Sequence, residues 1–317
     1  MTVALVAMSH SPLLGAGSPL PADIDRELTE TFDTARAFVR EFDPTLVISF
    51  APDHYNGFFH ELMPPFCVGF AAESTGDYDS PTGPLDVPGD LAASLAQSVL
   101  DADVDVAISR RMIVDHGAVQ PLEILFGGID AIPVIPVFVN GLAQPFAPMR
   151  RVRRLGEAIG RFAAGLDERV LLIGSGGLSH DPPVPQWATA TDVQRRLLLD
   201  GKNPTPQARA AREQRVKDAA AEFVVGHSTM RDLNPEWDNR FLDTCAAGDP
   251  QRFDDYHHAE MTAAAGSSAH EVRSWVAAFS ALAASGDYQV STRYYRPIRE
   301  LIAGFGLLTA APTPTGH

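Results

Sequence analysis

Apolar and polar positions alternate in blocks along the first two-thirds of the chain. Short runs rich in Val, Ile and Leu, each closed by Gly, Pro or Ser, are typical of buried strands. Longer stretches with apolar residues three or four positions apart are typical of helices that pack on a core. We therefore expect strands at about 2–8, 45–50, 104–108, 132–139 and 169–173, and helices at about 23–42, 89–100, 118–126 and 148–165.

The order of these elements predicts the fold class. Strands that alternate with helices imply βαβ units, so we expect a single α/β domain with a mostly parallel central sheet flanked by helices. From about residue 205 the pattern is helical, with one further strand near 288–295. The domain should span 1–308, and the tail 309–317 should be disordered or used in subunit contacts. Two long connections, 51–88 and 174–204, have lengths typical of lids or binding loops.

Composition narrows the class of protein further. The chain has 317 residues, of which 45% are hydrophobic and 21% charged, as expected for a globular protein with a full-sized core. A formal net charge of −15 argues against nucleic acid and anionic membranes as partners. Two cysteines without a C-x-x-C pair predict neither disulfides nor a thiolate zinc site, and favour the cytoplasm. No basic N-terminal segment or run of about 18 apolar residues occurs, so we expect no signal peptide and no membrane span.

Four histidines share one position relative to the predicted strands. His10, His54, His116 and His180 each follow an apolar run at the point where it gives way to a loop. Ligands in open α/β sheets collect at the carboxyl ends of the strands, so these imidazoles should meet there. A structural role is reasonable for any one of them, but less so for four in the same place. The remaining histidines considered are expected to be solvated or structural: His60, His227, His257, His258 and His317.

Two histidines and one carboxylate form the ligand set of non-haem iron(II) oxygenases. The candidate pair is His10 and His54, at the ends of the first two strands. Glu271 is the candidate carboxylate, but Ser268-x-x-Glu271 also fits a capping box, in which the glutamate only bonds back to the start of its helix. Two aspartates beside the histidines could be ligands instead, or could orient a histidine: Asp53 and Asp115.

His116 and His180 would then be free for proton transfer, for which imidazole is suited by its pKa near neutrality. His180 ends the segment Gly174-Ser-Gly-Gly-Leu-Ser-His180. This segment lacks both the Lys-Ser/Thr of a phosphate loop and the G-x-S-x-G of a nucleophile elbow. We expect its glycines to let the backbone and His180 approach a planar ligand closely.

The stretches around these residues resemble the class III extradiol ring-cleavage dioxygenases, and the resemblance covers nearly the whole chain. It implies that His10, His54 and Glu271 bind iron(II), that His116 is the proton donor and that His180 is the proton acceptor. The matching segments are Ser9-His-Ser-Pro-Leu13, Phe50-Ala-Pro-Asp-His-Tyr-Asn-Gly-Phe58, Met63-Pro-Pro-Phe-Cys67, Val114-Asp-His-Gly117, Gln120-Pro-Leu-Glu123, Gly174-Ser-Gly-Gly-Leu-Ser-His180, Pro235-Glu-Trp-Asp-Asn239 and Arg293-Tyr-Tyr-Arg-Pro-Ile298.

The resemblance also implies a reaction. The expected substrates are O2 and a catechol with a three-carbon acid side chain, 3-(2,3-dihydroxyphenyl)propionate or 2,3-dihydroxycinnamate, and the product is a 2-hydroxy-6-oxonona-dienedioate of aromatic catabolism. Arg293 and Arg296 are candidates for binding the side-chain carboxylate, because a guanidinium can bind it with two hydrogen bonds. The alternative for both is a surface arginine paired with an acid. The family tendency is toward homo-oligomers.

Two other hypotheses use the same cluster. A zinc hydrolase would need a tetrahedral site with one open position and would not depend on O2. A non-catalytic metal-binding protein on the same fold would not need the two free imidazoles of His116 and His180, which argues against it.

Overall fold

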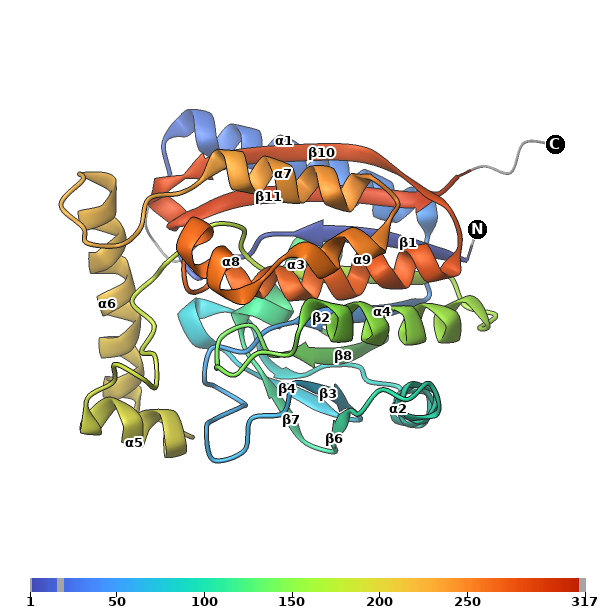
Figure 1. Ribbon diagram of the computed structural model, residues 1–317, viewed down its shortest axis with the longest axis horizontal. Coiled ribbons are helices and arrows are strands. Elements are labelled where there is room, and N and C mark those ends of the chain that lie inside the picture. Colours follow the sequence, from blue (N-terminus) through green and yellow to red (C-terminus); the bar gives the residue numbers. More distant parts are fainter. Residues whose placement is uncertain (1, 16–19, 314–317) are drawn as a thin grey trace.

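The structure is a computed structural model that describes residues 2–15 and 20–313. It is a single α/β domain in which an eight-stranded sheet of order β10-β11-β1-β9-β2-β8-β3-β6 lies between helices (Figure 1), beside a smaller sheet of order β5-β4-β7. The strands are β1 (Val3–Met8), β2 (Leu46–Ala51), β3 (Phe66–Gly69), β4 (Ala72–Thr75), β5 (Thr82–Pro84), β6 (Ala107–Ser109), β7 (Met112–Val114), β8 (Val134–Val139), β9 (Val170–Ser175), β10 (Tyr288–Ile298) and β11 (Ala303–Pro312). The helices are α1 (Ala22–Phe42), α2 (Gly89–Asp101), α3 (His116–Phe126), α4 (Met149–Ala164), α5 (Asp192–Asp200), α6 (Pro206–Val224), α7 (Pro235–Ala246), α8 (His258–Ala265) and α9 (Arg273–Ser285), with 3-10 turns η1 (Asp77–Asp79), η2 (Pro250–Asp255), η3 (Ala269–Val272) and η4 (Arg299–Leu301).

The centre of the large sheet is parallel. Strands β1, β9, β2 and β8 pair in parallel and are buried along their whole length. Helices cover both faces, which is why these strands are continuous apolar runs rather than alternating ones. Toward the edges, β11 pairs antiparallel with β1 and with β10, and β3 pairs antiparallel with β8. The predicted α/β class is therefore confirmed, with a mixed sheet that is parallel at its centre.

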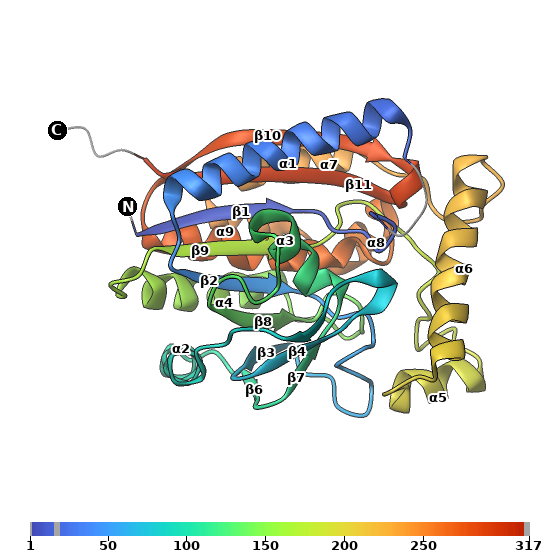
Figure 2. The same cartoon turned by 180° about the vertical axis from the view of Figure 1, so that it is seen from behind.

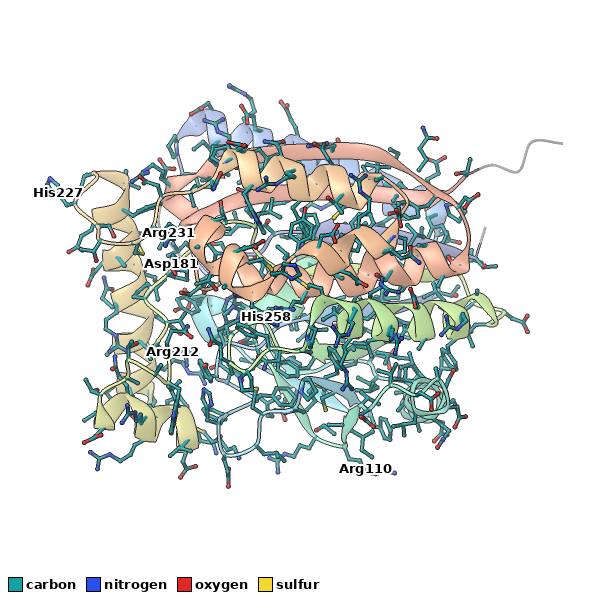
Figure 3. All side chains as sticks on the ribbon, in the orientation of Figure 1. Arg110, Asp181, Arg212, His227, Arg231 and His258 are labelled. Carbon is teal, nitrogen blue, oxygen red and sulfur yellow. The ribbon has the colours of Figure 1, made fainter. Side chains whose placement is uncertain are left out.

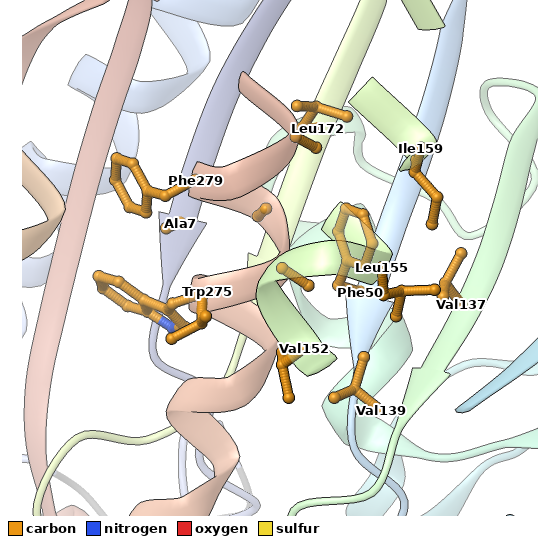
Figure 4. Close-up of a cluster of buried hydrophobic side chains, with 14 of the residues drawn as sticks. Ala7, Phe50, Val137, Val139, Val152, Leu155, Ile159, Leu172, Trp275 and Phe279 are labelled. Carbon is orange, nitrogen blue, oxygen red and sulfur yellow. The ribbon is translucent and has the colours of Figure 1, made fainter. Parts of the chain in front are cut away.

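The two faces of the sheet carry different helices. Helices α4 and α9 lie on one face, and Figure 4 shows Leu155 of α4 beside Phe50 of β2 and Trp275 of α9 near Ala7 of β1. The two helices pack closely, because a Cβ at Gly160 of α4 would overlap the carbonyl oxygen of Ala281 in α9. Helices α1 and α3 lie on the opposite face, as seen in Figure 2.

Three regions differ from the prediction. The stretch expected to be irregular, 51–88, contains β3, β4, β5 and η1, and the strand expected at 104–108 begins at Ala107. Strand β11 was not predicted, because it is built largely from Gly and Ala rather than from β-branched residues. The predicted tail is wrong for residues 309–312, which belong to β11, whereas 314–317 lie outside the described residues.

Helices α5 and α6 stand at one end of the domain, away from the sheet (Figures 1 and 2). Within α6 only Ala220 and Phe223 are buried. Arg212 of this helix donates a hydrogen bond of 2.5 Å to the carbonyl of His54, and it lies between α6 and the main body (Figure 3). Helix α6 thus supports a loop that carries one of the four histidines. Among the described residues, no helix has the length and apolar character to cross a membrane.

Candidate metal centre

The carboxyl ends of three neighbouring strands bring three of the four histidines together. His10 follows β1, His54 follows β2 and His180 follows β9, and these strands lie side by side in the order β1-β9-β2. His116 comes from elsewhere: it follows β7 of the small sheet and is the first residue of α3. The expectation that all four histidines end strands of one sheet is therefore wrong for His116, although it joins the same cluster.

Three acceptor groups converge at the centre of the cluster. Nε2 of His10 lies 3.4 Å from Nε2 of His54 and 3.4 Å from Oε2 of Glu271. Nε2 of His54 lies 3.3 Å from Oε1 of Glu271. The rings of His10 and His54 are nearly perpendicular, at 88°, so their planes intersect close to both rings. A single ion can therefore lie in the plane of each imidazole.

In each imidazole, the hydrogen-bond partner of Nδ1 determines whether Nε2 can act as a metal ligand. Ser175 donates its hydroxyl proton to the carbonyl of Gly117, so Ser175 Oγ accepts from Nδ1 of His10 at 2.9 Å. Nδ1 of His54 donates to Oδ2 of Asp115 at 3.1 Å. When both imidazoles are neutral, their Nε2 atoms consequently present lone pairs, and together with the carboxylate of Glu271 they form a group of acceptors without a donor between them. A cation satisfies this arrangement, and such partners at Nδ1 are the usual way in which proteins orient metal-bound histidines.

His116 does not fit as a third ligand with this pair, although a nitrogen of its ring lies within 4.8 Å of those of His10 and His54. Its ring stacks on that of His54 with centroids 4.4 Å apart and an angle of 24°. Two nearly parallel planes at this separation do not meet near the rings, so no ion could lie in both. Nε2 of His116 is buried and has no hydrogen-bond partner.

His180 lies against the opposite side of Glu271. Its Nδ1 donates to the carbonyl of Leu178 at 3.0 Å, and its Nε2 lies 3.1 Å from Oε1 of Glu271. A Cβ at Gly177 would lie 2.6 Å from Cε1 of His180, and one at Gly176 would lie 2.6 Å from the carbonyl oxygen of Glu271. The glycines of this loop thus make room for Glu271 and the His180 ring.

Glu271 is not a helix cap. Ser268, the N-cap of η3, makes no side-chain hydrogen bond to the helix, so the capping box is not formed. Instead the buried carboxylate accepts a hydrogen bond from the backbone N–H of Gly177 at 3.2 Å and faces three histidines. Its placement favours the ligand hypothesis over the capping one.

Burial and charge set the protonation of these groups. Burial lowers the pKa of His10 to about 3, despite the opposing effect of Glu271. Burial would raise the pKa of Glu271, but the imidazoles of His180 and His54 outweigh it and hold this pKa well below its ordinary value. Burial likewise opposes charge on His54, but Asp115 and Glu271 outweigh it and raise the pKa of this imidazole. A proton on His54 thus takes the place of a cation in an otherwise negative cluster.

The two aspartates considered as alternative ligands hold the loop after β2. Asp115 accepts hydrogen bonds from the backbone and the ring of His54 and from Asn56. Asp53 accepts from three successive backbone N–H groups, at residues 56, 57 and 58. Burial and the neighbouring Asp115 raise the pKa of Asp53 to about 7. Asp115 therefore orients His54, and Asp53 holds the loop that follows it.

The structure does not bring Arg293 and Arg296 to the cluster. They lie on β10, the edge strand two positions from β1, where Arg293 pairs with Asp243 at 2.5 Å. Arg296 pairs with Asp23 and Glu27 of α1 at 2.7 and 2.8 Å. Both arginines form surface ion pairs, which was the alternative that the sequence left open.

Of the remaining histidines, His227 is exposed at the far end of α6, as Figure 3 shows. His258 accepts a hydrogen bond of 2.6 Å from the buried Arg273, so its role is structural, and His317 lies outside the described residues. Three buried residues that contact the cluster or its loops were assigned no role from the sequence. They are Ser175, which holds His10; Asp77, which holds His116; and Asp238, which holds Ser179.

The comparisons with known proteins agree along the whole chain. The family described as catalytic LigB subunit of aromatic ring-opening dioxygenase matches residues 4–306. The chain is 60% identical over 311 residues to the 2,3-dihydroxyphenylpropionate/2,3-dihydroxicinnamic acid 1,2-dioxygenase of Rhodococcus rhodochrous, covering 98% of both chains. It is 57% identical over 310 residues to that of Rhodococcus globerulus and 53% identical over 311 residues to that of Mycolicibacterium gilvum, again covering 98% of both chains.

Proposed function

Because the chain belongs to the LigB family of catalytic subunits of aromatic ring-opening dioxygenases, we propose that it is an iron(II) extradiol dioxygenase that cleaves 3-(2,3-dihydroxyphenyl)propionate. The product is the 2-hydroxy-6-oxonona-dienedioate that results when both atoms of O2 enter the substrate, and 2,3-dihydroxycinnamate is a second substrate. The printed names of the relatives support this choice of acids. The observation that carries the chemistry is the convergence of two imidazole lone pairs and one carboxylate, the ligand set of iron(II) oxygenases.

His10, His54 and Glu271 would hold the metal. When bound, iron(II) supplies open coordination positions and the electron transfer that lets a catechol react with O2. The chain's part is to fix the ligands: Ser175 orients His10, and Asp115 orients His54. The metal would supply the oxygen chemistry, and side chains of the protein would transfer the protons.

His180 and His116 would transfer these protons. Nδ1 of His180 is protonated, because it donates to the carbonyl of Leu178. Its Nε2 faces Oε1 of Glu271, and it could accept a phenolic proton from the catechol once that carboxylate holds the metal. His116 presents a buried Nε2 with no protein partner, from which a proton can pass to the oxygen that leaves the ring carbon. Acceptor and donor then stand on either side of the proposed metal ligands, His180 beside Glu271 and His116 beside His54.

The experiment is O2 uptake by protein that has been reconstituted with iron(II) under anaerobic conditions and given 3-(2,3-dihydroxyphenyl)propionate. We expect one O2 consumed per catechol and the yellow dienedioate as product. Zinc-loaded protein is the control for the hydrolase hypothesis, and it should take up no O2. Absence of uptake with iron demonstrably bound would contradict the proposal.

The ligand set is tested by iron content. Glu271→Gln removes the charge of the proposed carboxylate ligand, so iron retained per chain after gel filtration should fall at least tenfold. Glu260→Gln is the matched control, because Glu260 is exposed on α8. Equal iron retention in the two variants would remove Glu271 from the ligand set.

The cytoplasmic location and the homo-oligomeric state stay predictions. Light scattering of the purified protein would test the oligomeric state.

A further inference from the structure

Asp77 is a buried carboxylate that the reaction described above does not use. Its Oδ2 accepts a hydrogen bond of 2.6 Å from Nδ1 of His116, and its Oδ1 accepts one of 2.9 Å from the backbone N–H of the same residue. Both oxygens are thus committed to His116, which fixes the start of α3 and the orientation of the ring at once. Asp77, Asp115 and His116 offer ligand atoms within 4.8 Å of one another. Since the oxygens of Asp77 already accept N–H groups, hydrogen bonding accounts for this group without a second metal ion.

The turn that carries Asp77 is strained. Tyr78 has φ 49° and Asp79 has φ 62°, both in the left-handed region that L side chains rarely adopt. The surrounding structure holds the turn in place, since Glu213 of α6 accepts a hydrogen bond of 3.0 Å from the backbone N–H of Tyr78. Strain of this kind persists where a side chain must be presented in one geometry, and here the side chain presented is Asp77.

The two histidines that are not proposed as metal ligands differ in the hydrogen-bond partner of Nδ1. His180 has the neutral carbonyl of Leu178 at Nδ1, whereas His116 has the carboxylate of Asp77. A buried carboxylate at Nδ1 keeps the proton on that nitrogen and holds the ring in one orientation, as the aspartate of a Ser-His-Asp triad does. Nε2 then becomes the only nitrogen of His116 that can exchange a proton with a substrate. This nitrogen is buried and has no hydrogen-bond partner among the residues that the structure describes.

We propose that Asp77 is the positioning residue for the proton donor: it holds His116 by Nδ1 and by the backbone, so that Nε2 faces the bound catechol and delivers the proton in ring opening. The inference rests on the proposed function for the reaction, but the geometry of the Asp77–His116 pair belongs to the chain alone. Asp77 itself does not touch the substrate.

The first test uses the iron-free protein and no substrate. With 15N-labelled histidine, NMR should show that Nδ1 of His116 in the wild type carries a proton in a strong hydrogen bond. In Asp77→Asn this signal should move or be replaced by a mixture of tautomers, while Asp79→Asn, an exposed change in the same turn, should leave it unchanged. An unprotonated Nδ1 in the wild type would overturn the proposal, whether or not the variants fold.

The second test uses the iron-loaded enzyme. Asp77→Asn should lower kcat on the order of 10²-fold or more, within the range expected for loss of a proton-transfer group. Iron content and anaerobic affinity for the catechol should stay unchanged, because the metal ligands are untouched. In a His116→Phe background, Asp77→Asn should have no further effect on kcat, since Asp77 acts only through His116.

The outcomes separate the two proposals. A wild type that takes up no O2 with iron bound contradicts the proposed function, and the NMR result then decides the role of Asp77 by itself. An active wild type with an equally active Asp77→Asn variant overturns the positioning role. An equal loss of kcat from Asp77→Asn with and without His116 would mean that Asp77 only stabilises the fold, which also overturns it.

Discussion

The loop that ends in His180 depends on one buried carboxylate, and replacing it with alanine should destabilise the protein strongly. Asp238 of α7 is fully buried and accepts two hydrogen bonds from Ser179, of 2.7 Å from the backbone N–H and 2.6 Å from the hydroxyl. It accepts a third, of 2.7 Å, from the hydroxyl of Tyr295 on β10. Asp238 thus ties the residue before His180 to both a helix and the edge of the sheet.

The magnitude follows from these three donors. A hydrogen bond to a charged group contributes about 1.5–3 kcal/mol, and part of the sum is offset by the cost of burying the carboxylate. Burial also raises the pKa of Asp238, although the hydrogen bonds from Ser179 and Tyr295 oppose this effect. Asp238→Ala leaves three neutral donors without their acceptor, each at a cost of about 1–3 kcal/mol, and part of this cost is offset because no carboxylate has to be buried. We therefore expect a net loss of about 3–5 kcal/mol for Asp238→Ala. Tyr295→Phe removes one donor and should cost about 1.5–2 kcal/mol.

The assay is thermal unfolding of the iron-loaded enzyme. At about 2 °C per kcal/mol for a domain of this size, Asp238→Ala should lower Tm by roughly 6–10 °C and Tyr295→Phe by roughly 3–4 °C. Asp243→Ala is the matched control on the same helix, because its ion pair with Arg293 is exposed and such pairs contribute at most about 1 kcal/mol. The reasoning is refuted if Asp238→Ala and Asp243→Ala lower Tm equally.

Two further predictions concern packing and pH. Gly160→Ala should lower the free energy of unfolding in urea by about 2 kcal/mol or more, because its Cβ would overlap the backbone of Ala281. Gly165→Ala, at the C-terminal end of the same helix, is the control. Its Cβ would meet its nearest atom at 3.5 Å, so the change should be neutral or slightly stabilising. Burial beside Arg273 lowers the pKa of His270 from 6.5 to about 3. Between these two pH values the unfolded chain therefore binds more protons than the folded one. The free energy of unfolding should fall as the pH drops below 6.5, by up to about 1.4 kcal/mol per pH unit. His270→Gln should make the free energy of unfolding fall less steeply from pH 6.5 to 5, and equal slopes would show that His270 does not titrate in this way.

The part of the fold that could be predicted from the sequence is the part buried on both faces. Strands β1, β2, β8 and β9 are continuous apolar runs because helices cover them on either side, so local pattern and tertiary environment agree. The short strands β4 and β5 belong to a small sheet and pair with each other over only three residues. A run of three or four residues gives no periodicity, and such strands exist only because their partners are in place.

The candidate site divides in the same way. The histidines after β1, β2 and β9 could be predicted to meet because parallel strands place their carboxyl ends on one edge. Asp77 and Asp238 could not, since each acts on a residue far away in the sequence, across 39 and 59 positions. The segments that contain Asp238 and Tyr295 resembled the family before any role was visible. The structure supplies the reason: Oδ2 of Asp238 accepts hydrogen bonds from both Ser179 and Tyr295.

Glu271 shows most clearly why local motifs are insufficient. Its four-residue neighbourhood fits a helix cap as well as a metal ligand, and only the structure around η3 removes the capping interpretation. That position requires glycine on two sides: a Cβ at Gly176 would lie 2.6 Å from the carbonyl oxygen of Glu271, and one at Gly141 would lie 2.9 Å from its Cα. Both contacts are with backbone, which cannot move aside as a flexible side chain can. The close approach of the proposed carboxylate ligand to the sheet therefore explains the glycines after β8 and β9. They are needed for this backbone contact, and not for a phosphate loop or a turn.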